Sequence, residues 1–83
     1  MQYKKLYRIY YTAFDDKINE IVVNELKEKY KTNINIIKSI LVPEFRALEL
    51  NLNKEGFSNE IKELVSSLTN SKYVRVDFID TSI

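Results

Sequence analysis

The chain has 83 residues, with 13 Lys and Arg against 12 Asp and Glu, one Gly, one Pro, and no Cys or His. A chain of this length suits one domain, so we expect residues 1–83 to form a single one. The missing Cys and His exclude disulfides, most zinc sites and catalysis by Cys or His. No apolar run approaches the roughly 20 residues that span a bilayer, and no signal peptide is apparent. We therefore expect a cytoplasmic protein that is not an enzyme and needs no cofactor.

The first predicted elements are a strand and a helix. Residues 4–12 alternate loosely and are rich in Tyr and Ile, which favours a strand. Apolar residues then follow at helical spacing from Phe14 to Tyr30. Thr12 has the position of a capping residue, and Asn33 can adopt the left-handed conformation that ends a helix.

The next two segments predict a β-hairpin. Residues 35–42 are β-branched and apolar, and residues 45–53 alternate between the two faces of a strand. Pro43 and Glu44 lie between them and favour a turn, because proline cannot donate to a strand ladder.

A second helix and a last strand complete the chain. Gly56 interrupts the strand pattern, and Ser58 is a candidate N-cap for the helix that follows. Asn70 is a candidate stop, and residues 73–80 alternate again.

This order predicts an α+β fold of ferredoxin-like βαββαβ topology, a four-stranded antiparallel sheet with two helices on one face. The first and third strands are expected to be central, with Tyr7, Ile9 and Tyr11 turned toward the helices. The remaining predicted core residues are Ile18, Ile21, Val22, Leu26, Leu48, Leu50, Phe57, Ile61, Leu64, Leu68, Val74, Val76 and Phe78. The uncovered face would then carry Arg8, Tyr10, Phe45, Ala47, Glu49, Arg75 and Asp77.

Two acids follow the first strand, where several ferredoxin-like nucleases place a metal-binding carboxylate. Asp15 and Asp16 also suit the start of a helix, where acidic side chains cap free amides and stabilise the dipole. A Mg²⁺ site would need further converging oxygens. The capping interpretation is favoured, and a metal-dependent nuclease is kept as an alternative.

Nucleic-acid binding is a related alternative, because this fold can stack bases on aromatic residues of its central strands. Tyr10 and Phe45 are the candidates here, but Glu49 and Asp77 put acids on the same surface. A balanced charge gives little counterion-release drive, so nucleic acid is disfavoured as a partner. The competing interpretation is a cross-strand charge lattice that keeps the open face soluble.

The six tyrosines have two interpretations: an interaction surface, since Tyr is enriched in protein interfaces, or simply the preference of Tyr for strands. The predicted sheet has two edges, at its second and fourth strands. Pairing of these edges, or packing of two open faces, would produce a homodimer.

Residues 21–30 predict a helix that ends in Tyr30, and residues 32–37 add a short turn and a strand. This stretch resembles the first helix and second strand of the NIL domain, a ferredoxin-like relative of the ACT domain. Residues 45–50 resemble its third strand, and residues 61–76 its last helix and strand. NIL domains occur on methionine-importer ATPases, on iron–sulfur proteins linked to sulfur amino-acid synthesis, and as short stand-alone chains.

The resemblance implies a dimeric module that binds or senses a small amino acid near the first strand–helix loop and the second strand. The positions carried over are Thr12, Phe14, Asp15, Asn35 and Ile37. Exposed amides at the helix start could hold a carboxylate, although the acids there oppose one. The alternative is a protein-interaction module, such as a phage- or plasmid-encoded inhibitor or adaptor, which would need no catalytic residues.

Overall fold

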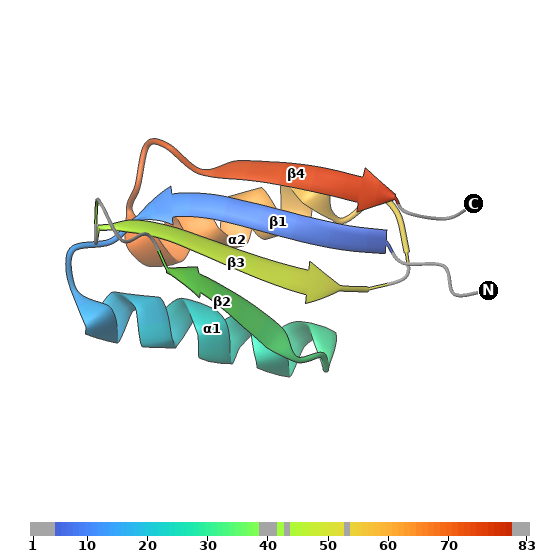
Figure 1. The fold of residues 1–83 in the computed structure, drawn as a ribbon, viewed down its shortest axis with the longest axis horizontal. Helices are drawn as coiled ribbons and strands as arrows, with labels where there is room; N and C mark the ends of the chain where they lie inside the picture. Colours follow the sequence, from blue (N-terminus) through green and yellow to red (C-terminus); the bar gives the residue numbers. More distant parts are fainter. Residues whose placement is uncertain (1–4, 39–41, 43, 53, 81–83) are drawn as a thin grey trace.

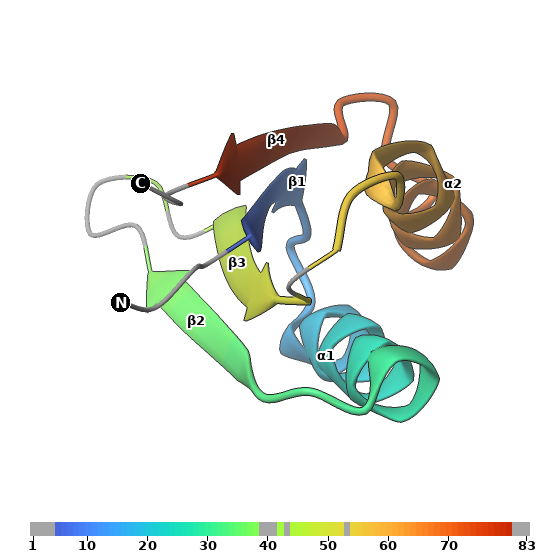
Figure 2. The same cartoon turned by 90° about the vertical axis from the view of Figure 1, so that its right-hand side faces the viewer.

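The sheet and helices follow the predicted order in the computed structural model, which describes residues 5–38, 42, 44–52 and 54–80. The elements are β1 (Lys5–Thr12), α1 (Asp16–Tyr30), β2 (Ile34–Lys38), β3 (Phe45–Asn51), α2 (Ser58–Thr69) and β4 (Arg75–Asp80). The strands pair antiparallel in the order β2-β3-β1-β4 (Figure 1). Both helices lie on the same side of the sheet (Figure 2). The predicted ferredoxin-like fold is confirmed, while the turn predicted at Pro43 lies outside the described residues.

The alternation of β1 explains how the sheet acquires one face covered by the helices and one face that no described helix covers, here called uncovered. Tyr7, Ile9 and Tyr11 are buried in the core, as the sequence predicts. They are joined there by Ala13, Val22, Val23, Leu26, Leu48, Leu50, Ile61, Val65 and Val74. Successive strand residues point to opposite faces, so Arg8 and Tyr10 lie on the uncovered side. Neither helix of the described chain has the length and apolar character needed to cross a membrane.

The boundaries of α1 differ from the prediction by a few residues. Asp15 caps the helix, its carboxylate accepting a hydrogen bond of 2.9 Å from the Lys17 amide. Thr12 belongs to β1 instead, with its hydroxyl 3.3 Å from that of Ser71. The helix ends at Lys31, which adopts the left-handed conformation predicted for Asn33.

The second helix also begins one residue away from its predicted cap. Phe57 has the N-cap position and makes no side-chain capping bond, so Ser58 is already the first helical residue. Asn70 ends α2 with φ of 53°, which confirms the predicted stop. Gly56 has φ of 91°, a conformation that residues with a Cβ rarely adopt.

Three predicted apolar positions are more exposed than expected. Phe14 precedes α1 and is 86% exposed, because the loop turns its ring outward. Ile21 is 48% exposed, since α1 presents the next residue, Val22, to the sheet. Phe78 lies on an edge strand and is 38% exposed, although its ring centroid is 5.1 Å from that of Tyr7.

Candidate functional site on the open sheet face

The strand register arranges the uncovered surface, here called the open face, in rows across the sheet. One row contains Asn35, Glu49, Arg8 and Asp77, in the order β2-β3-β1-β4, and we call it the charged row. The next row contains Ile37, Ala47, Tyr10 and Arg75, and we call it the tyrosine row. Beyond it, Thr12 pairs with Phe45. All seven open-face residues predicted from the sequence therefore lie together on one surface.

The charges of the open face pair with one another. Arg8 donates to the same Glu49 oxygen from Nη2 at 2.9 Å and from Nε at 3.2 Å. These hydrogen bonds to Glu49 raise the pKa of the Arg8 guanidinium above its ordinary value. Arg75 Nε lies 2.9 Å from Asp77 Oδ1 on the neighbouring edge strand. Arg8 and Glu49 thus form one cross-strand pair of the kind the sequence suggested, whereas Arg75 and Asp77 pair within β4.

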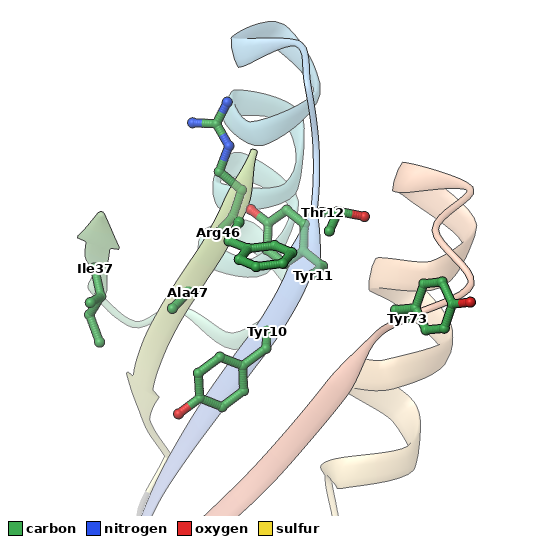
Figure 3. A pocket seen from close by; sticks show the side chains of 8 residues that line it. Tyr10, Tyr11, Thr12, Ile37, Arg46, Ala47 and Tyr73 are labelled. Atoms are coloured by element: carbon green, nitrogen blue, oxygen red, sulfur yellow. The ribbon is translucent and has the colours of Figure 1, made fainter. Parts of the chain in front are cut away.

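A hollow of about 410 Å³ lies over the tyrosine row. It is lined by Tyr10, Tyr11, Thr12, Ile37, Phe45, Arg46, Ala47 and Tyr73. Figure 3 shows the small Ala47 side chain between Ile37 and Tyr10, so the depression forms where the row carries its smallest residue. Phe45 and Tyr73 remain 53% and 79% exposed at its walls. We call this feature the Ala47 hollow.

The cation that lines the Ala47 hollow is already engaged elsewhere. Arg46 Nε donates to the Ala13 carbonyl at 3.0 Å, and its Nη2 lies 2.9 Å from Asp16 Oδ1. Its guanidinium extends away from Tyr10 in Figure 3. Tyr11 is buried and donates its hydroxyl hydrogen to Asn19, and burial raises its pKa to about 12. The hollow therefore offers mainly apolar surface.

The five residues implied by the NIL resemblance are divided among three places. Thr12 and Ile37 line the Ala47 hollow. Asn35 lines a second, more polar depression at the other end of the open face, beside Glu49. Phe14 and Asp15 lie in the loop before α1 and line neither depression. The structure does not gather these five residues into one pocket.

The acids after β1 have structural partners. Asp15 caps α1 and Asp16 pairs with Arg46, which supports the capping interpretation. In the part of the chain that the structure describes, no group of three or more acidic side chains is placed to hold a metal ion.

Sequence reasoning missed two features of the hollow. Tyr73 alternates in phase with Arg75 and Asp77, so its pattern could have assigned it to this surface. The role of Ala47 depends on its neighbours in the row, which come from three different strands. Only the register reveals that a small residue stands between two large ones.

The fold and its uncovered sheet define this chain as a small α+β protein of the ferredoxin-like class. It is similar to the solved apo structure of LarC2, the C-terminal domain of a cyclometallase involved in the synthesis of the NPN cofactor of lactate racemase. The TM-score is 0.56 at 18% identity, over 99% of this chain and 59% of that one. The chain thus spans about three fifths of that protein's length, and the likeness supports the fold alone. No protein-family model and no curated protein matches the sequence.

Proposed function

We propose that this chain is a non-enzymatic binding module and that its open face is the surface that associates with a protein partner. The Ala47 hollow is the observation that carries the proposal. It combines an apolar floor with exposed aromatic walls at Phe45 and Tyr73. Pockets that accept an apolar anchor and are rimmed by aromatic residues are typical of the centres of protein interfaces.

The chemistry of the hollow favours an apolar side chain over a free amino acid. A zwitterion needs a partner for its carboxylate, but Arg46 is already paired with Asp16. At the start of α1, the Lys17 amide already donates to the Asp15 carboxylate, so it is not free to bind the carboxylate of a ligand. An apolar group, by contrast, gains about 25 cal/mol for each Å² removed from water and needs no such partner.

The test is affinity capture with the immobilised protein from a lysate of its native cells, which also contains the untagged chain. Ala47→Glu places a charge in the hollow, and we expect it to reduce capture by roughly tenfold or more. Ser67→Glu is the matched control, since it adds the same carboxylate to an exposed position of α2. Circular dichroism establishes that both variants are folded. Capture that is equal for wild type and Ala47→Glu contradicts the proposal.

A second candidate is the amino-acid sensor implied by the NIL resemblance. Its support is that Thr12 and Ile37, from two of the segments carried over, line the same hollow. A ligand at ten times its Kd stabilises the folded state by about 1.4 kcal/mol, which a thermal-shift screen of the amino acids detects. If no amino acid at millimolar concentration raises the melting temperature, this candidate is removed.

A further inference from the structure

The charged row has a symmetry that suggests what the open face binds. Arg8 on β1 and Glu49 on β3 are register partners on the two central strands. Consider a two-fold axis parallel to the strands and midway between β1 and β3. It stacks β1 of one molecule over β3 of a second copy, and β2 over β4. Arg8 then faces Glu49 of the second copy, and Glu49 faces Arg8 of the second copy.

We propose that the partner is a second copy of this chain, packed open face against open face about this axis. The inference rests on the proposed function in taking the open face as the association surface. Such an interface is isologous, so every contact occurs twice. The two sheets would lie about 10 Å apart, as in β-sandwiches.

Charge complementarity favours this axis over two others that also stack the open faces. Here Arg8 has a Glu49 beside it and a second Glu49 across the interface, and Asp77 faces the Asn35 amide. An axis along the charged row, perpendicular to the strands, would place Arg8 over Arg8. An axis along β1 would do the same. Like charges facing each other across an interface repel, so these arrangements are disfavoured.

The shape of the tyrosine row fits the same axis. Tyr10 and Ala47 are register partners, so Tyr10 of each copy faces Ala47 of the other. The Tyr10 ring would therefore enter the Ala47 hollow, a large side chain meeting a small one as close packing requires. Ile37 would face the aliphatic stem of Arg75, which can cover apolar surface while its charge remains with Asp77.

The test is sedimentation equilibrium from about 10 µM to about 1 mM, a range that resolves weak dimers. We expect the wild type to dimerise. Arg8→Glu and Glu49→Arg should each raise the dimer Kd by roughly tenfold or more, because each places like charges across the axis. An equimolar mixture of the two variants should dimerise again, since the introduced acid then faces the introduced base. In each variant, residues 8 and 49 of the same molecule carry like charges, and mixing the variants does not change this. Recovery of dimerisation in the mixture therefore reports the contact between the two copies.

Matched controls come from α2, on the opposite layer. Lys62 and Glu63 are exposed there, so Lys62→Glu and Glu63→Arg should leave the Kd unchanged. If the single variants do not fold, two others decide the question. The double variant Arg8→Glu/Glu49→Arg should dimerise, and Tyr10→Ala should weaken the dimer by roughly tenfold.

Three outcomes overturn the inference. They are a wild type that stays monomeric at every concentration, a dimer that neither charge variant weakens, and a mixture of folded variants that stays monomeric. The second outcome would indicate pairing through the edge strands β2 or β4. The wild type could also stay monomeric while Ala47→Glu still abolishes capture of another protein. That pair of results would exclude a second copy as the partner and would leave the proposed function intact.

Discussion

The hydroxyl groups of the two buried tyrosines in β1 connect the sheet to other elements. Tyr7 donates to the Lys54 carbonyl and accepts from the Phe57 amide, which holds the segment that leads into α2. Tyr11 donates to Asn19 on α1. A buried hydroxyl left without a partner costs about 1–3 kcal/mol, so these contacts fix both helices relative to β1.

Tyr11 makes the stability of the fold depend on pH in the alkaline range. Burial raises its pKa to about 12 in the folded protein, compared with about 10 for an exposed tyrosine. As the pH rises above about 10, the Tyr11 hydroxyl therefore ionises in the unfolded chain before it ionises in the folded protein. The stabilisation is therefore complete below about pH 10 and is lost as the pH rises toward the folded value. Urea denaturation between about pH 8 and pH 11 should show a falling free energy of unfolding, with a shallower slope in Tyr11→Phe. Tyr73→Phe controls for removal of an exposed phenol, and equal slopes in wild type and Tyr11→Phe would sink the assignment.

Single residues show which side-chain positions the sequence pattern predicts and which it does not. The alternation in β1 correctly predicts Tyr7 and Tyr11 inside and Tyr10 outside, because side-chain direction in a strand has a period of two. The engagement of Arg46 could not be predicted in this way. It depends on Asp16, 30 residues earlier, which only the folded chain brings within 2.9 Å.

At the scale of elements, the connection between β1 and α1 is a structural joint. Ala13 is buried, and its amide donates to the Glu44 carbonyl at 2.9 Å. Asp15 caps the helix and Asp16 holds Arg46. Asp15 and Asp16, the acids considered as a metal or ligand site, therefore stabilise the start of α1.

The capping role of Asp15 predicts a particular set of mutant stabilities. Asp15→Ala should lower the free energy of unfolding by about 1 kcal/mol, whereas Asp15→Asn keeps an acceptor and should lose much less. Urea denaturation measures both, and the dimer Kd should be the same in both variants. A ligand role is indicated instead if Asp15→Ala leaves stability unchanged but abolishes binding.

The elements themselves were predictable because their apolar periods are strong, but their ends were not. The stripes in α1 and α2 and the alternation in β3 each continue for several turns or residue pairs. The end of α1 instead depends on one residue taking a left-handed conformation. Lys31 does so, although Asn33 is the residue type that usually favours it.

At the scale of the whole molecule, the sheet has two faces of different character. Both helices cover one face, where the described core residues lie (Figure 2). The open face exposes aromatic and aliphatic side chains next to paired charges. The topology, and with it the identity of the open face, follows from the order of elements in the sequence. The Ala47 hollow and the two-fold pattern of the charged row depend on register, which no single segment specifies.

The most direct test of this account is hydroxyl-radical footprinting across a dilution series, read residue by residue by mass spectrometry. Tyr10 and Phe45 lie at the proposed surface, whereas Phe14 is exposed in the loop before α1. Concentrations that favour association should reduce oxidation of Tyr10 and Phe45 by roughly threefold or more and leave oxidation of Phe14 unchanged. Protection of Phe14 with Tyr10 and Phe45 unaffected, or no protection at any concentration, would contradict it.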